Sequence, residues 1–325
     1  MKAIDTWERV LIGLIVLVYV AFGLGIPGFL APYAIADSTT NMSEKAIIAL
    51  AMALLVVAGE IDLSIAATMA LCSLALGLAM QAGAPLPLML MAAASTGAAC
   101  GALNGWLVTR WQLPSIVVTI GTLSLYRGLA QVLLGDQAIT GYPDSLSMWG
   151  NGSLGDLVGA PKLIVPIEFA VMALMAVLVG LLLHRTVHGR RIYAIGANWT
   201  AARFSGIAVD RYRFALFVFA GLMAALASVL LTGRIGSTRP NLALGWELDA
   251  VTIVILGGVA IEGGRGSIVG TILASVLLGS FTFGLGMLNV SGIVMSMIVG
   301  ALLVVSMVLP RWLRYGALLR RVRAA

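Results

Sequence analysis

The residues best suited to chemistry in this chain are two carboxylates, Glu60 and Asp62, in the run GEIDLS at 59–64 between two apolar segments. Ionisable side chains at membrane depth are costly, so a functional role such as binding a proton or a cation is one interpretation. In the other, the turn faces water, where a carboxylate is hydrated or where Asp62 or Ser64 caps the following helix. The residues alone leave both interpretations open.

Other chemistries find less support in the sequence. The glycine-rich run GGVAIEGGRGS at 257–267 resembles the 59–64 turn, which hints at an internal duplication, but a phosphate-binding loop ends in Gly-Lys-Ser/Thr. None of the lysines Lys2, Lys45 and Lys162 follows a glycine, so we expect no ATP hydrolysis by this chain. His184 and His188 can share a helix face, yet two histidines do not make a zinc site. We predict no catalytic residue, metal or cofactor of its own.

The composition is that of an integral membrane protein. Apolar residues make up 60% and charged residues 10% of the 325 positions, and the mean hydropathy is +1.03, whereas soluble domains are about 25% charged. The fold class predicted is all-α, with about ten transmembrane helices in a single domain over 1–325. The candidate spans are about 10–29, 44–59, 64–81, 87–109, 114–134, 163–184, 213–233, 246–260, 267–287 and 290–309, of which the second and eighth are short.

The basic residues are distributed asymmetrically between the predicted loops. With ten spans, fifteen of the 20 lysines and arginines fall on the side of the N-terminus. The positive-inside rule then places both termini and the 189–213 loop in the cytoplasm. The net charge of +6 is spread over loops, which does not indicate nucleic-acid binding. The tail 311–325 carries five arginines and is predicted to lie near anionic lipid.

The loop 189–213 contains the pattern of a short helix outside the membrane. Asn198 is a good N-cap, 199–205 can form about two turns, and Gly206 can supply the left-handed residue that ends them. A helix this short is marginal alone, so we expect another protein surface to hold it. The alternative is an ordinary basic cytoplasmic loop.

Polar and small residues inside the spans suggest a passage and close helix packing. The dense small residues at 92–102 let helices approach closely and favour an oligomer. The isolated Cys72 and Cys100 are interpreted as packing residues. Candidates for lining a translocation pathway are Asn104, Thr119, Thr122, Ser124, Tyr126, Arg127 and Asn241, with Glu247 and Asp249 beside them. Each of these polar residues could equally join neighbouring helices.

Four ordered blocks resemble one family of membrane proteins. They are AGEIDLSIAA at 58–67, PSIVVTIGTLSLYRGLA at 114–130, GRRIYAIGANWTAARFSGI at 189–207 and AVTIVILGGVAIEGGRGSIVGTILAS at 250–275. The chain resembles, from about 45 to 310, the permease subunits of carbohydrate-type bacterial ABC importers, the group that includes those for ribose, xylose, rhamnose and autoinducer-2. Glu60 departs from the pattern, which has a glycine before the Ile-Asp pair.

The resemblance implies a permease of the bacterial inner membrane that carries a monosaccharide or sugar-like solute, such as rhamnose, ribose or another pentose, or autoinducer-2. It implies a cytoplasmic ATPase that binds ATP, a periplasmic solute-binding protein and a second permease chain, either a copy or a paralogue. The cytoplasmic loop at about 185–212 then carries a coupling helix that docks on the ATPase. The matching positions are Gly196, Asn198, Ala201, Ala202, Arg203, Ser205 and Gly206. The rival classes are an ion-coupled secondary transporter using Glu60 or Asp62, and a receptor-like membrane protein.

Overall fold

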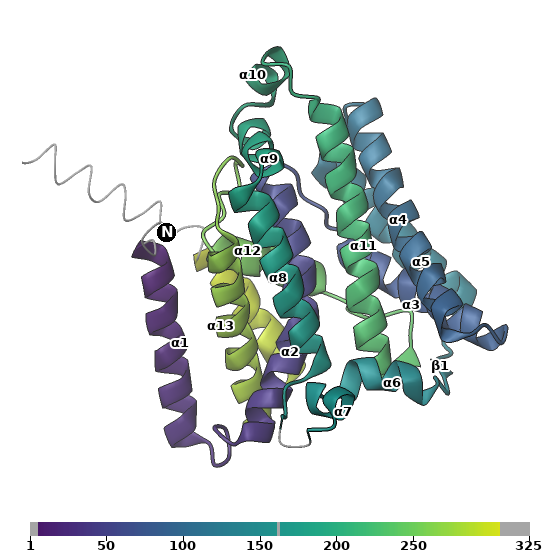
Figure 1. Cartoon of the computed structure of the whole chain (residues 1–325), viewed down its shortest axis with the longest axis vertical. Coiled ribbons are helices and arrows are strands. Elements are labelled where there is room, and N and C mark those ends of the chain that lie inside the picture. The colour runs from purple at the N-terminus through teal and green to yellow at the C-terminus, as the bar shows by residue number, and fades with distance from the viewer. Residues whose placement is uncertain (1–5, 161–162, 306–325) are drawn as a thin grey trace, which may run out of the picture.

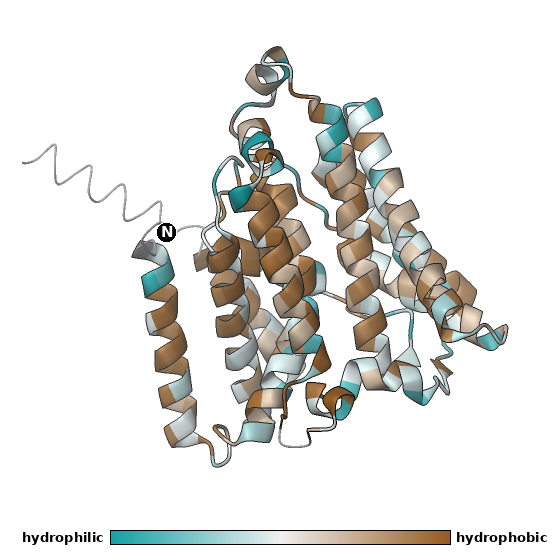
Figure 2. Ribbon diagram, in the orientation of Figure 1, coloured by the Kyte–Doolittle hydropathy of each residue, from teal (hydrophilic) through white to brown (hydrophobic). Residues whose placement is uncertain are grey.

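The protein is a bundle of roughly parallel and antiparallel helices (Figure 1). The computed structural model describes residues 6–160 and 163–305. Seven helices are long and apolar enough to cross a membrane, and Figure 2 shows apolar residues along their middle parts and hydrophilic ones at the two ends. They are α1 (Thr6–Gly25), α2 (Pro32–Val57), α4 (Leu86–Arg110), α5 (Ser115–Leu134), α8 (Ile167–Arg185), α11 (Val209–Ile235) and α13 (Ile268–Met287).

Three further helices are shorter, and the first and last of them are apolar. They are α3 (Ile65–Gln81), α12 (Trp246–Leu256) and a helix at Gly292–Val305. The eighth predicted span is indeed short, because α12 has 11 residues between the glycines Gly245 and Gly257. The predicted tenth span runs past residue 305, and the basic tail 311–325 and Lys162 also lie outside the described residues.

The second predicted span, 44–59, was wrong in length. α2 has 26 residues and begins with Pro32 at its first position, where a missing N–H costs nothing. Its first half is polar and looks like a loop, but those side chains find partners inside the bundle, as Lys45 does with Asp249 at 2.6 Å. Its second half, 46–58, is buried on all sides. α2 is therefore a central helix, against which α8, α11, α12 and α13 pack.

The small residues of 92–102 let α4 approach another helix closely, as predicted, and the structure shows that this helix is α11. These two helices have the most extensive contact in the described part of the chain. A Cβ added at Gly101 would lie 2.9 Å from the Phe217 carbonyl carbon, and one at Gly97 would lie 2.9 Å from the Ala225 Cβ. The helix backbones thus touch directly, a packing that only glycine permits.

The two ends of the bundle carry different short elements. At one end, uppermost in Figure 1, lie α9 (Val187–Ala197) and α10 (Trp199–Phe204). At the other lie α6 (Asp144–Asn151), α7 (Leu154–Val158) and a two-stranded antiparallel sheet of β1 (Ile139–Thr140) and β2 (Ser237–Thr238). Of these elements, α6 packs on α11. We call these the α10 end and the α6 end.

Candidate functional site

The predicted short helix at the α10 end is present, with both predicted caps. The Asn198 Oδ1 accepts a hydrogen bond from the Ala201 N–H at 2.9 Å. Gly206 has φ +82°, its N–H donates to the Arg203 carbonyl at 3.0 Å, and the Ile207 N–H donates to the Ala202 carbonyl at 3.1 Å. This pair of bonds is a Schellman ending, which satisfies carbonyls that the helix leaves free.

Two aromatic side chains that the sequence interpretation did not single out are exposed on α10. The Phe204 side chain is 89% exposed and that of Trp199 is 51% exposed. Arg203 forms an ion pair with Asp210 at 2.7 Å and lies 5.4 Å from the Trp199 ring centre. α10 projects beyond the rest of the bundle (Figure 1). Exposed aromatic side chains on a projecting helix are typical of a protein-binding surface.

Six of the seven positions predicted for coupling lie in α10 or directly beside it, and the seventh is Gly196. Asn198 and Gly206 shape the helix, Ala202 is buried in the cluster formed by Ile195 and Val209, and the Ser205 hydroxyl donates to the Ala201 carbonyl at 2.9 Å. These residues set the position of α10, while Trp199 and Phe204 form its outward surface.

Gly196, the remaining position, lies in what we call the glycine junction, formed by Gly59, Gly196, Gly263 and Gly264. The Gly264 N–H donates to the Val57 carbonyl at 2.8 Å, which joins the end of α2 to the turn between α12 and α13. A Cβ at Gly196 would lie 2.5 Å from the Gly264 nitrogen and closer still to the Val57 carbonyl oxygen. The backbone of α9 therefore rests directly on both turns, with no side chains between them.

The carboxylates of the 59–64 turn lie beside this junction and are buried, which excludes the hydrated interpretation. Glu60 is 5% and Asp62 2% exposed. Glu60 forms an ion pair with Arg213 of α11. Burial raises the pKa of the Glu60 carboxyl above its usual range, and the Arg213 guanidinium opposes that rise. A hydrogen bond from the Ser115 side chain of α5 acts in the same direction as Arg213, so partners from two helices hold the carboxyl.

The cap interpretation of the same turn fails for Ser64 but holds for Asp62, whose side chain accepts a backbone N–H at the start of α3. Ser64 stands at the N-cap position of α3 without a capping hydrogen bond. Instead, its N–H and its hydroxyl both donate to the Asp62 Oδ1, at 2.9 and 2.6 Å. Burial raises the pKa of the Asp62 carboxyl, and the bonds from Ser64 counteract this rise.

Two of the predicted pathway residues, Asn104 and Tyr126, join neighbouring elements, and Thr119 also bonds to the Ile61 carbonyl in the 59–64 turn. The Asn104 Nδ2 donates to the Ser64 Oγ at 2.8 Å, and the Tyr126 hydroxyl donates to the Cys100 carbonyl at 3.0 Å. Thr119 and Thr122 are buried on the same face of α5. The structure therefore places these four side chains in a polar layer between α3, α4 and α5 that continues from Asp62.

The other predicted pathway residues lie towards the α6 end. Arg127 donates to the carbonyls of Pro240 and Leu242, at 2.9 and 2.7 Å, and so joins α5 to the segment before α12. Ser124 and Asn241 are exposed. The Arg127 Nε and the Glu247 Oε2 are buried without a hydrogen-bond partner, so this region has free polar atoms.

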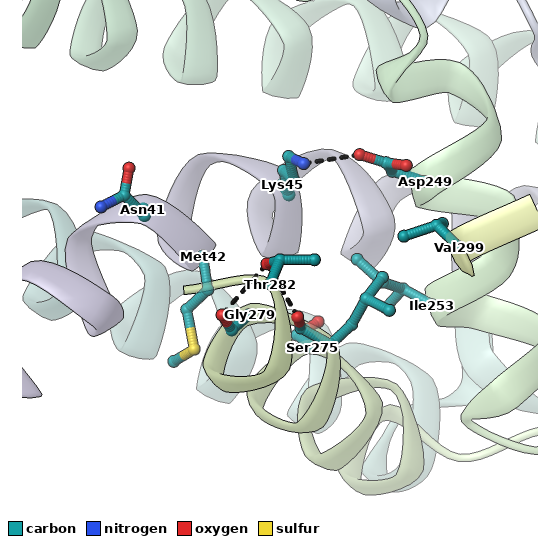
Figure 3. Close-up of a pocket in the computed structure, with 10 residues that line it drawn as sticks. Asn41, Met42, Lys45, Asp249, Ile253, Ser275, Gly279, Thr282 and Val299 are labelled. Atoms are coloured by element: carbon teal, nitrogen blue, oxygen red, sulfur yellow. Dashed lines mark hydrogen bonds and ion pairs between the residues drawn. The ribbon is translucent and has the colours of Figure 1, made fainter. Parts of the chain in front are cut away.

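A small polar cavity lies between α2, α12, α13 and Val299 (Figure 3). Lys45 and Asp249 form their ion pair on its wall, and the Lys45 ammonium lies 5.0 Å from the Trp246 ring centre. Its volume of about 30 Å³ holds one or two water molecules. A monosaccharide does not fit there in this conformation.

The two histidines do not share a helix face, which corrects the prediction. α8 ends at Arg185 and α9 begins at Val187 after the N-cap Thr186, so His184 and His188 belong to different helices. The His188 Nδ1 is 2.9 Å from the Tyr212 hydroxyl, and the His184 Nε2 accepts from the Ile268 N–H at 3.2 Å. Within residues 6–160 and 163–305, no group of three His, Cys, Asp or Glu side chains is arranged to hold a metal ion.

Comparison with known proteins gives consistent matches over nearly the whole chain. The family described as "Branched-chain amino acid transport system / permease component" matches residues 34–307. The chain is 34% identical over 302 residues to the ribose import permease protein RbsC of Bacillus subtilis, covering 92% of this chain and 91% of that protein. It is 36% identical over 306 residues to the autoinducer 2 import system permease protein LsrD of Escherichia coli O9:H4, covering 93% and 91%. No solved structure matches.

Proposed function

The chain belongs to the family described as "Branched-chain amino acid transport system / permease component", and from this premise we propose that it is the membrane-spanning permease subunit of an ABC importer. It is a multi-pass protein of the inner membrane, with seven helices long and apolar enough to span. The permease provides the passage and the ATPase-binding surface. ATP is bound and hydrolysed by a separate subunit.

The solute we propose is a monosaccharide or a sugar-like molecule. The similar proteins are named for ribose and autoinducer 2 import, and the deoxyhexose rhamnose or a pentose other than ribose has a similar size and similar hydroxyl groups. The ion-coupled alternative is not favoured, because the named relatives are import permeases. In addition, the Glu60 carboxylate is held by Arg213 rather than open to a passage.

We propose ten spans, which are the seven long helices together with α3, α12 and the helix that begins at Gly292. Both termini and the α10 end then face the cytoplasm, and the α6 end faces the periplasm. The excess of arginine and lysine on the α10 side supports this orientation. Short helices such as α12 are tolerated at membrane depth where neighbouring helices satisfy their ends.

The ATPase subunit docks on the surface formed by Trp199 and Phe204, in this proposal, and the solute-binding protein docks at the α6 end. The passage lies between this chain and a second permease, either a copy or a paralogue. Movement of the docked α10 passes through α9 and the glycine junction to the ends of α2 and the α12–α13 turn. That route is supported by the backbone contacts of Gly196.

The observation that carries the docking proposal is the exposed Phe204 on a helix capped at both ends. The test is reconstitution of the permease in liposomes with its ATPase and binding protein, followed by uptake of labelled monosaccharides. Phe204→Ala is expected to weaken ATPase binding and to lower uptake, while Leu24→Ala, an equally exposed position on α1, leaves both unchanged. Normal ATPase binding by Phe204→Ala would contradict the docking surface. Ion-driven uptake by the chain alone would contradict the importer.

A further inference from the structure

Two buried carboxylates and one arginine meet between three helices towards the α6 end. Glu44 comes from α2, Glu168 from the first turn of α8, and Arg234 from the last turn of α11. Both glutamates have no exposed surface. The Arg234 Nε is 2.7 Å from the Glu44 Oε1 but 3.9 Å from the Glu168 Oε2. The arginine thus binds Glu44 and only approaches Glu168.

Three carboxylate oxygens in this cluster have no hydrogen-bond partner. They are the Glu44 Oε2 and both oxygens of Glu168. Buried polar atoms are nearly always hydrogen-bonded, and an ionised carboxylate needs several donors when it leaves water. Glu168 has none among the described residues, so it does not have the surroundings of an ionised group.

The charges around the cluster do not balance if both glutamates are ionised. On α2, Lys45 is bound to Asp249 of α12 and so belongs to another pair. α13 has no charged residue, and Asp144 of α6 is exposed. Arg234 also donates to the Asn41 Oδ1 at 3.0 Å, which is neutral. One guanidinium therefore faces two carboxylates, and one negative charge remains without a partner.

The N-terminus of α8 does not remove this excess. A helix N-terminus carries about half a positive charge, which is less than the full charge of a carboxylate. No backbone N–H of the first turn donates to a Glu168 oxygen. A divalent cation would need six or more oxygen ligands, whereas three free oxygens are present here and Arg234 repels it. A proton is the ligand that fits.

We propose that Glu44 and Glu168 share one proton and, together with Arg234, form a neutral cluster that joins α2, α8 and α11. The proton turns one carboxyl into a donor to the other, which gives two of the three unpartnered oxygens a hydrogen bond. Carboxyl groups that share a site in this way bind one proton between them. The proposal does not depend on the solute or on the ATPase.

Infrared spectroscopy of the purified full-length chain at pH 7 tests the proposal, because a protonated carboxyl has its own C=O stretching band. Glu168→Gln and Glu44→Gln are each expected to remove the band of one protonated carboxyl, since the remaining glutamate then pairs with Arg234. The double variant is expected to remove no more than either single one. Asp136→Asn, at an exposed position, is the control and leaves the band unchanged.

The outcomes separate the alternatives. If neither glutamine variant changes the band, both carboxylates are ionised and the proposal is wrong. If the double variant removes twice the intensity, each carboxyl holds its own proton, and sharing is wrong. If sodium or calcium ions raise the melting temperature of the wild type but not of Glu168→Gln, the site binds a metal cation instead. Should one glutamine variant fail to fold, the other makes the same prediction.

Discussion

Replacing Gly196 by alanine tests whether the glycine junction is as tight as its backbone contacts indicate. The new Cβ would lie 2.5 Å from the Gly264 nitrogen and closer to the Val57 carbonyl oxygen, well inside normal contact distance. Both neighbours are backbone atoms, so no side-chain rotation can relieve the clash. Overpacking of this kind costs about 1–3 kcal/mol.

Helix propensity acts in the opposite direction. Alanine is favoured over glycine by about 0.8–1.0 kcal/mol inside a helix, but Gly196 lies in the last turn of α9, where the gain is smaller. The clash therefore exceeds the gain, and we expect a net loss of about 1–2 kcal/mol. Gly196→Val adds two methyl groups at the same place and is expected to lose more than Gly196→Ala.

Thermal unfolding of the purified chain measures the loss of stability, and reconstituted uptake per ATP hydrolysed measures coupling. Gly13→Ala in α1 is the matched control, because it is also helical and has no heavy atom within 4 Å of the added Cβ. We expect the control to lose no stability and to gain up to about 1 kcal/mol, because Gly13 lies inside α1 and alanine is the better helix former. Unchanged stability of both Gly196 variants would refute the contact argument. A loss of stability with normal coupling would support the tight contact at Gly196 but would refute the proposal that movement of α10 passes through it.

Three further substitutions test other parts of the structure. Gly101→Val is expected to force α4 and α11 apart, because its Cβ would lie 2.9 Å from the Phe217 carbonyl carbon. The expected loss of stability in a melting experiment is at least about 1–3 kcal/mol. An unchanged melting temperature would contradict direct backbone contact. Arg213→Met leaves the Glu60 carboxylate buried without its partner and is expected to lower the free energy of unfolding by about 3–5 kcal/mol. Adding Glu60→Gln should recover much of that stability. A double variant as unstable as Arg213→Met would argue against the ion pair. Burial raises the pKa of Asp62 above its unfolded value, so its contribution to stability is greatest below about pH 4 and decreases as the pH rises through the folded pKa. Between pH 4 and 7, the free energy of unfolding should therefore change less with pH for Asp62→Asn than for the wild type. The same pH dependence in both proteins would exclude this cause.

α10 could be predicted because its capping residues lie close together in the sequence. The polar first half of α2 could not be predicted, because its partners lie far away in the sequence. Asn198 and Gly206 determine their helix ends through bonds to residues three to five positions away, which a sequence displays directly. The polar half of α2 is helical because Glu44 and Lys45 meet partners 190 and 204 residues later in the chain. Without those partners, the residues before 44 have the composition of a loop. The exposed Phe204 was missed for a related reason, since apolar type alone does not distinguish a docking surface from a core.

The burial of the 59–64 turn changes the meaning of Glu60. A hydrated carboxylate there would leave the turn free to move separately from α11. The ion pair with Arg213 instead binds the turn to the start of α11, only a few residues beyond α10. The turn thus has two connections to the α9–α11 segment, one through van der Waals contact at Gly196 and one through a buried charge pair.

These two connections differ in strength, and the difference determines how a displacement of α10 reaches α2. Separating the glycine contact breaks only dispersion interactions, of about 0.1–0.2 kcal/mol per atom pair. Separating Glu60 from Arg213 leaves buried charges unpaired, at a cost of about 3–5 kcal/mol. When α9 moves away from the 59–64 turn, the ion pair should therefore make the turn follow α11. When α9 moves towards the turn, Gly196 should push it. On this reasoning, Arg213→Met should impair the pulling direction of coupling, and Gly196→Ala should alter the pushing direction.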